Sequence, residues 1–229
     1  MGSVIGKESV AEPSYRCLFQ RSSQAQTPYE VREYGKRFVA EVCYSDSENT
    51  GTPFRMLADY IGVFGKPHNE GQESMAMTAP VVIDQRQGTQ ISMTAPVVTE
   101  NATPEGGEKR MKFFLPAEYD NMSKIPTPSN PSVKIAEVPP AIGAVHRYSG
   151  SMSEKINEER ALALAAQLRK DGVERLTDAI AKQHFQFWGF NPPFTIPMFR
   201  RNEVWLELSH EEVKLLQRKF EPSGNEATS

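Results

Sequence analysis

Apolar and polar residues alternate along two stretches of the chain, and these stretches repeat one pattern. Phe38, Ala40, Val42 and Tyr44 are spaced by single residues, which is the two-residue period of a strand with one buried face. A second stretch matches the first at an offset of 104 residues, pairing Val31 with Ile135, Glu33 with Glu137, Phe38 with Ile142, Ala40 with Ala144 and Tyr44 with Tyr148. Each copy predicts a strand, a short break (Gly35-Lys36 or Pro139-Pro140), a second strand and a helix.

The helix of the second copy carries signals at both ends. Ser151 followed by Glu154 is a capping-box pattern, and Asp171-Gly172 is typical of a helix end. Ile156, Ala161, Leu164 and Leu168 supply its apolar positions. The two copies predict one pseudo-symmetric α+β domain, with a curled antiparallel sheet or distorted barrel and two main helices.

The helix of the first copy is apolar around most of its circumference. Thr52-Pro53 predicts its start. From Phe54 to Phe64, the residues that are neither apolar nor aromatic are Arg55, Asp59 and Gly62. The apolar arc is wider than the roughly 100° that packing on one sheet requires. The surplus face, near Phe54, Leu57, Ala58 and Ile61, is either covered by loops or a dimer partner, or forms one wall of a ligand cleft.

A six-residue segment occurs twice in the middle of the chain. Met-Thr-Ala-Pro-Val-Val spans Met77–Val82 and again Met93–Val98. Because one sheet needs one such strand, we expect one copy in the central sheet and the other in a hairpin, a loop or an edge position. Pro80 and Pro96 restrict either copy to a strand end or an edge.

A stiff apolar loop precedes the last predicted strand. Pro192, Pro193 and Pro197 fix their own backbone angles and exclude a helix. Its apolar residues are Phe194, Ile196, Met198 and Phe199. An apolar loop of fixed shape either fills a core or forms a wall of a ligand cleft. Arg200 and Arg201 follow it, and they either meet an acidic ligand or brace the strand from Asn202 by pairing with Glu203 or Glu207.

The remaining segments set the expected domain limits. Residues 174–183 predict one or two helical turns before a strand at 184–188, and the capping-box pair Ser209 and Glu212 predicts a short terminal helix. Residues 221–229 have the composition of a disordered tail. We therefore expect an N-terminal arm over residues 1–14, one domain over 15–208, and a short helix with a tail over 209–229.

Composition narrows the class of protein. A chain of 229 residues is usual for one domain, and a net charge of −3 without a basic run makes nucleic acid an unexpected partner. No apolar stretch has the roughly 20 residues of a membrane span, and the N-terminus lacks a secretory pattern. We expect a cytoplasmic protein in which Cys17 and Cys43 are reduced, buried thiols.

Sequence motifs of catalysis are missing, so we expect no enzymatic activity. The chain has no nucleophile elbow, P-loop, dinucleotide fingerprint or HExxH motif. Its four histidines, His68, His146, His184 and His210, are scattered. His68 is the weak candidate for an iron ligand, because it follows the first helix and imidazole commonly binds haem iron.

Three ordered motifs resemble those of a known family. The chain reads YEVREY at Tyr29–Tyr34, MTAPVV twice, and NPPFTIPMFRRNEVW at Asn191–Trp205. These resemble the motifs of the SOUL haem-binding proteins, over roughly Tyr15 to Leu208. The repeated hexamer, the opening Met1-Gly2 and YIGVFGKP at Tyr60–Pro67 are similar to the plant and algal cytosolic branch. The resemblance implies two βαββ units that form a curled eight-stranded sheet.

The resemblance also implies a function and a site. It implies a cytosolic carrier or buffer of haem or another porphyrin, bound non-covalently between the first helix and the 192–201 loop. The expected lining is Phe54, Arg55, Leu57, Ala58, Ile61, Lys66, Phe194, Ile196, Met198, Arg200 and Arg201. The family's basic positions correspond here to Gly51, Asp59 and Thr195, so Arg55, Lys66, Arg200 and Arg201 are the substitute partners for the propionates. The alternative is a protein-interaction module that uses the same helix and loop.

Overall fold

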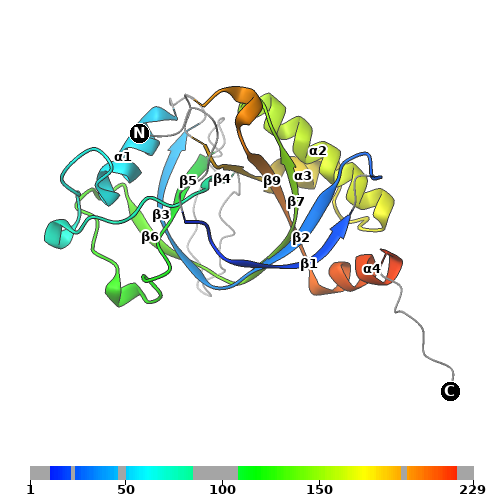
Figure 1. Ribbon diagram of the computed structural model, residues 1–229, viewed down its shortest axis with the longest axis horizontal. Helices are drawn as coiled ribbons and strands as arrows, with labels where there is room; N and C mark the ends of the chain where they lie inside the picture. Colours follow the sequence, from blue (N-terminus) through cyan, green and yellow to red (C-terminus); the bar gives the residue numbers. More distant parts are fainter. Residues whose placement is uncertain (1–10, 22–23, 46–49, 85–107, 192–194, 221–229) are drawn as a thin grey trace, which may run out of the picture.

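The computed structural model describes residues 11–21, 24–45, 50–84, 108–191 and 195–220. Within these ranges nine strands form one antiparallel sheet in the order β1-β2-β7-β9-β8-β4-β5-β3-β6. The sheet curls strongly without closing, and the helices lie on its outer side (Figure 1). The predicted α+β class with a curled antiparallel sheet is therefore confirmed.

The elements follow the chain in this order. The strands are β1 Tyr15–Arg21, β2 Tyr29–Tyr34, β3 Arg37–Ser45, β4 Val81–Asp84, β5 Glu108–Phe114, β6 Lys134–Val138, β7 Ala141–Tyr148, β8 Gln186–Gly189 and β9 Asn202–Leu208. The helices are α1 Gly51–Ile61, α2 Glu154–Asp171, α3 Asp178–His184 and α4 His210–Phe220. Three short 3-10 turns are η1 Glu70–Gln72, η2 Met122–Lys124 and η3 Pro197–Phe199.

The predicted repeat is visible in the strand order. Both copies have two strands, a break and a helix, as β2-β3-α1 and β6-β7-α2. The eight strands from β2 to β9 are related by a twofold symmetry of their order. If β2 is exchanged with β6, β3 with β7, β4 with β8 and β5 with β9, the result is the same strand order read from the other edge of the sheet. Strand β1 is an addition to the eight strands that the resemblance implies, and it forms one edge by pairing with β2.

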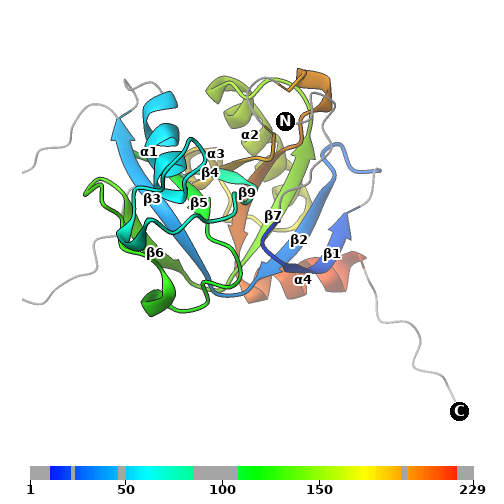
Figure 2. The ribbon, with the colours of Figure 1, turned by 60° about the vertical axis from the view of Figure 1, so that its left-hand side comes forward.

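Two apolar cores lie between the outer face of the sheet and the helices. Helix α1 packs on β3 and β5, and α2 packs on β7 and β9. Figure 2 shows these two helices over different halves of the sheet. Val31, Ala144 and Leu206 face α2, whereas Phe38, Val42 and Phe113 face α1. The alternating apolar residues that the sequence shows in β3 therefore lie on the outer face of the sheet, under α1.

A third core lies inside the curl, on the opposite face of the same strands. It contains Tyr34, Val39, Phe114, Val145, Trp188, Phe190 and Trp205. Both faces of the central strands are therefore buried, which explains consecutive apolar residues such as Val204, Trp205 and Leu206 in β9.

Several local expectations are confirmed. Gly172 ends α2 in a left-handed conformation, and Ser209 and Glu212 form the reciprocal capping box of α4. The first hexamer contributes Val81 and Val82 to β4, which lies between β5 and β8. The second hexamer and residues 221–229 lie outside the described residues.

Two local expectations are wrong. Helix α2 begins at Glu154 after Ser153, which makes no side-chain capping bond, so Ser151 and Glu154 form no capping box. Cys17 and Cys43 are exposed and not buried. Cys43 alternates with Val42 and Tyr44, whose side chains face the α1 core, so its own side chain lies on the other face.

Candidate functional site

The turn before β9 is held rigidly and presents apolar side chains to solvent. Phe199 N donates to Ile196 O at 2.9 Å, Arg200 N to Pro197 O at 3.1 Å, and Gly150 N to the same Pro197 O at 2.9 Å. Ile196, Met198 and Phe199 are 43%, 69% and 47% exposed. The predicted stiff apolar loop is thus present over its described part, and its apolar residues do not fill a core. Phe194 lies outside the described residues.

The two arginines after this turn have different neighbours. Arg200 Nε donates to Thr195 O at 2.7 Å, which closes the turn. Arg201 Nε donates to Glu203 Oε1 at 2.9 Å, its Nη1 donates to Glu12 at 2.8 Å, and its guanidinium lies 3.7 Å from the Phe190 ring centroid. The bracing interpretation is confirmed for Arg201, because its guanidinium already pairs with two carboxylates.

The surplus apolar face of α1 is covered by the chain that follows it. Leu57 and Ala58 are 0% exposed and Ile61 is 3% exposed. Met75 N donates to Ile61 O at 3.0 Å, and His68 N donates to Asp59 O at 2.9 Å. The expectation that Leu57, Ala58 and Ile61 line an open cleft is therefore wrong, because residues 68–75 and the 115–133 segment complete a core around them.

Other residues of α1 do reach the surface. Phe54 is half-buried, with its ring edge on Phe113 at a centroid distance of 5.3 Å. Arg55 is exposed and lies 3.9 Å from Asp59, a distance at the limit of an ion pair. Figures 1 and 2 both place α1 and η3 at the same end of the molecule. Phe54 and Arg55 are therefore the α1 residues that remain candidates for this site.

Two candidate residues follow the other end of α1. Lys66 and His68 are both exposed. An 11-residue helix is about 16 Å long, so they are separated from the first turn of α1 by most of that length. The structure does not group them with Phe54 and Arg55.

The other histidines have ordinary surroundings. The His146 ring is largely buried, and its Nδ1 lies 2.7 Å from Pro28 O, so this nitrogen carries the proton and donates it. Burial lowers the pKa of His146 below its usual 6.5. His184 ends α3 and His210 begins α4, both exposed. Among the described residues, no three His, Cys, Asp or Glu side chains form a metal-binding group.

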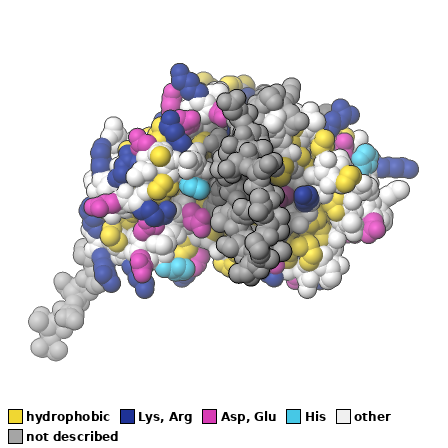
Figure 3. Space-filling model, turned by 180° about the vertical axis from the view of Figure 1, so that it is seen from behind, with side chains coloured by type: hydrophobic (Ala, Val, Ile, Leu, Met, Phe, Trp, Pro, Cys, Tyr) yellow, Lys and Arg dark blue, Asp and Glu magenta, His cyan; other side chains and the backbone are white. Residues whose placement is uncertain are grey.

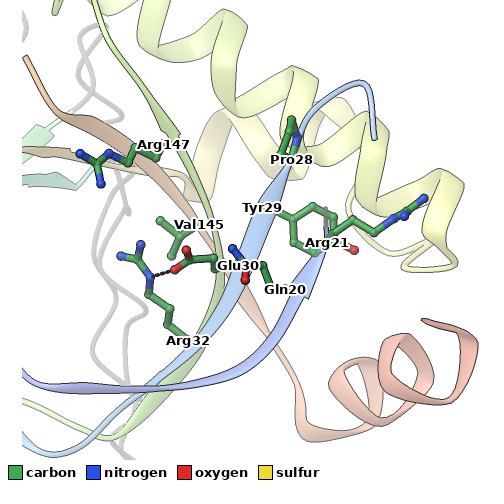
Figure 4. A pocket seen from close by; sticks show the side chains of 8 residues that line it. All are labelled: Gln20, Arg21, Pro28, Tyr29, Glu30, Arg32, Val145 and Arg147. Atoms are coloured by element: carbon green, nitrogen blue, oxygen red, sulfur yellow. Dashed lines mark hydrogen bonds and ion pairs between the residues drawn. The ribbon is translucent and has the colours of Figure 1, made fainter. Parts of the chain in front are cut away.

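Sequence reasoning missed a buried charge cluster on the inner face of the sheet. Arg32 Nη1 donates to Glu203 at 2.8 Å. Its Nε donates to Glu30 at 2.8 Å, and Figure 4 shows this second pair. Burial alone would lower the pKa of Arg32, but the Glu203 carboxylate raises it. The alternation of Tyr29–Tyr34 indicates a polar inner position for Arg32, although it does not reveal that the sheet curls over it.

The surface seen from behind is mixed in character. Hydrophobic side chains of the described residues reach the surface at several separate places on this face (Figure 3). Basic and acidic side chains are interspersed on this face. The described residues of this face show no continuous basic surface of the kind that nucleic-acid binding uses.

Comparisons with known proteins give a consistent assignment. Residues 10–207 match the model of the family described as SOUL heme-binding protein. Heme-binding protein 2 of Homo sapiens is 28% identical over 81% of this chain and 80% of its own length, and the Mus musculus protein of that name is 28% identical over 78% and 77%. Heme-binding protein 1 of Sus scrofa is 31% identical over 52% of this chain and 61% of its own length.

Solved structures share the fold at much lower identity. An uncharacterized conserved protein from Listeria innocua is 11% identical, with a TM-score of 0.52 over 79% of this chain and 92% of its own. The EcmrR C-terminal domain is 10% identical, with a TM-score of 0.50 over 80% and 98%. The described helices include none that is long and apolar enough to cross a membrane. The fold, the three motifs and the match over residues 10–207 show that this chain belongs to the SOUL heme-binding protein family.

Proposed function

We propose that this protein binds haem or another tetrapyrrole non-covalently and serves as a cytoplasmic carrier or buffer without catalysing a reaction. The family match and the names of its relatives support the ligand class. The repeated Met-Thr-Ala-Pro-Val-Val segment supports placement in the plant and algal branch. The observation that carries the proposal is the rigid turn on which Ile196, Met198 and Phe199 are 43%, 69% and 47% exposed.

The proposed site lies between this turn and the outer surface of α1. Large apolar side chains held in solvent on a stiff turn are characteristic of ligand and partner sites. Phe54 supplies an aromatic edge from α1, and Arg55 supplies an exposed cation near it. Leu57, Ala58 and Ile61 contribute indirectly, because their burial fixes α1 on the sheet.

Burial of the macrocycle accounts for useful affinity without an iron bond. A porphyrin is a flat apolar disc with two carboxylates at one edge. Burying about 400 Å² of it at ~25 cal/mol/Å² stabilises the complex by on the order of 10 kcal/mol before association costs. Arg55 and Arg200 are the proposed propionate partners, since an arginine pairs with a carboxylate through two hydrogen bonds.

Titration with hemin, followed by the Soret band, tests the site. Met198→Glu places a carboxylate against the macrocycle and should weaken binding at least tenfold. Leu215→Glu is the matched control, because Leu215 is also exposed, at 41%, but lies on α4. Equal hemin affinity in the two variants would contradict the site. If hemin causes no change in the Soret band with the wild-type protein, the proposed function is contradicted. The alternative is then that the turn binds a protein partner.

Comparison of haem with iron-free protoporphyrin tests the binding mechanism. If burial dominates, the two affinities should agree within about tenfold, or ~1.4 kcal/mol. His68→Ala should leave the protoporphyrin affinity unchanged and the haem affinity within that range. A preference for haem by several orders of magnitude that His68→Ala abolishes would establish an axial ligand and refute the burial mechanism.

A further inference from the structure

A cavity of about 330 Å³ lies where the start of β3 and the chain after β5 meet the N-terminal segment, away from the proposed tetrapyrrole site. Its walls come from the N-terminal segment 11–14, the start of β3, residues 76–78 and the 114–120 segment. None of the residues proposed to bind the tetrapyrrole lines it. The volume is in the range of small-molecule sites.

One wall of this cavity carries Arg37, an arginine that has no acidic partner among the residues that the structure describes. Arg37 Nε donates to Gly35 O at 3.1 Å, and its Nη1 is buried without any hydrogen-bond partner. Its guanidinium lies 4.5 Å from the centroid of the Tyr34 ring and 5.0 Å from that of Phe114. Among the described residues, no carboxylate lies within ion-pair distance of it. The Arg37 side chain is partly buried, and burying part of a cation without a partner is unfavourable.

Arg32, on β2, is an arginine of the same inner face whose guanidinium is paired with carboxylates. Glu203 and Glu30 accept its hydrogen bonds, and Figure 4 shows the Glu30 pair. Arg37 has no equivalent, and burial lowers its pKa to about 10, with the nearby Tyr34 opposing part of that shift. The two residues differ because no carboxylate of the described part of the chain pairs with Arg37.

The acidic residues on the cavity wall are already paired. Glu12 lies 2.8 Å from Arg201, and Asp120 lies 2.8 Å from Lys124. The second cation of the wall, Lys36, is 3.8 Å from Glu137. Among the described residues of this wall, Arg37 is therefore the cation that lacks a counterion. Much of the rest of the wall is apolar, from Phe38, Phe114, Leu115, Pro116 and Ala117.

We propose that this cavity binds a small aromatic carboxylic acid, whose carboxylate accepts hydrogen bonds from Arg37 and whose ring packs against Phe114 and Leu115. A carboxylate satisfies the guanidinium through two parallel hydrogen bonds. The apolar wall favours a ligand with a flat ring, because the ring buries apolar surface there. A small inorganic anion has no apolar surface to bury and is not favoured. The site is separate from the proposed tetrapyrrole site and does not depend on it.

Calorimetric titration with 2-naphthoate tests the proposal, with 2-naphthamide as the neutral analogue of the same shape. The wild type should bind the acid and discriminate against the amide by at least tenfold. Arg37→Gln should weaken acid binding by at least tenfold. Arg16→Gln is the matched control, because it removes the charge of an arginine whose side chain is 72% exposed, on β1. Equal binding of acid and amide, or no loss in Arg37→Gln, would overturn the proposal.

A second variant guards against a folding defect and tests the cavity itself. Ala117→Trp fills the cavity from an exposed position and leaves Arg37 in place. It should abolish 2-naphthoate binding while the thermal midpoint stays near that of the wild type. Saturating hemin should leave 2-naphthoate affinity unchanged. Displacement of the acid by hemin would overturn the separate site, and absence of 2-naphthoate binding to the wild type would overturn the proposal whatever hemin does.

Discussion

Arg201 and Glu203 form an ion pair at the start of β9, with Arg201 Nε 2.9 Å from Glu203 Oε1. Glu203 is completely buried, and Arg32 holds its other oxygen at 2.8 Å. Two arginines from different segments thus neutralise one carboxylate on the inner face of the sheet. This arrangement assigns Arg201 to the fold and leaves Arg200 and Arg55 as the proposed ligand partners.

Arg32→Met should destabilise the fold strongly. It leaves Glu203 with one cation, and breaking a buried pair costs roughly 3–5 kcal/mol. Because Arg201 remains, we expect about 3 kcal/mol in the free energy of unfolding, measured by urea denaturation. The double variant Arg32→Met, Glu203→Gln should recover part of that loss, because the uncompensated carboxylate is gone. A double variant whose loss is the sum of the two single losses would refute the pairing.

Gly143→Ala should destabilise the protein because the indole of Trp205 lies over Gly143. An added Cβ would come within 2.1 Å of that ring, well inside van der Waals contact. We expect a loss of about 1–3 kcal/mol or more in unfolding free energy. Gly35→Ala is the control, since a Cβ there meets nothing within 4 Å. It should change stability by less than about 1 kcal/mol. Similar losses at both sites would show that the indole does not occupy this position.

Leu57→Ala should cost roughly 2–5 kcal/mol, because Leu57 is 0% exposed between α1 and the sheet. Val63→Ala, two residues beyond the end of α1 and 42% exposed, should cost less than about 1 kcal/mol. Thermal or urea unfolding of both variants provides the comparison. A mild effect at Leu57 would restore the original interpretation, in which this face of α1 is open.

Two serines with the same capping-box pattern should behave differently. Ser209→Ala removes the acceptor of the Glu212 N–H, a hydrogen bond of 3.2 Å, and should cost about 1 kcal/mol. Ser151→Ala should be nearly neutral, because α2 begins at Glu154 after Ser153. The measurement is the difference in unfolding free energy between the two alanine variants. Equal losses of unfolding free energy in the two variants would contradict the structure, because they would mean that Ser151 caps α2.

Stability should fall in mildly acidic solution because of His146. Burial lowers its pKa in the folded state below 6.5, so the unfolded chain binds the proton more readily. The contribution of neutral His146 to the free energy of unfolding is fully present above pH 6.5. It is lost as the pH falls through the pKa of the folded state. His146→Gln should reduce the slope of unfolding free energy against pH in that window. An unchanged slope would mean that His146 is not the group responsible.

The sequence by itself determined the local structure and the family. The two-residue period of Phe38–Tyr44 gave the strand and its buried face, and the 104-residue offset gave the paired units. Gly172 marked the end of α2 and Ser209 the start of α4. Both signals depend only on residues close by in the sequence. Such signals are readable because strand alternation and helix capping act over a few residues.

The tertiary structure alone decided which surfaces meet. Leu57 and Ile61 looked available for a ligand, but residues that follow α1 in the chain cover them. Arg32 pairs with Glu203, 171 residues away, whereas no described carboxylate pairs with Arg37 on the same inner face. Hydrophobic periodicity indicates which faces of a helix or strand are buried. It does not indicate which segment of the chain covers each face. The curl of the sheet and the long-range pairing of its strands set those contacts. The exposure of the turn at 196–199 and the cavity at Arg37 are therefore visible only in three dimensions.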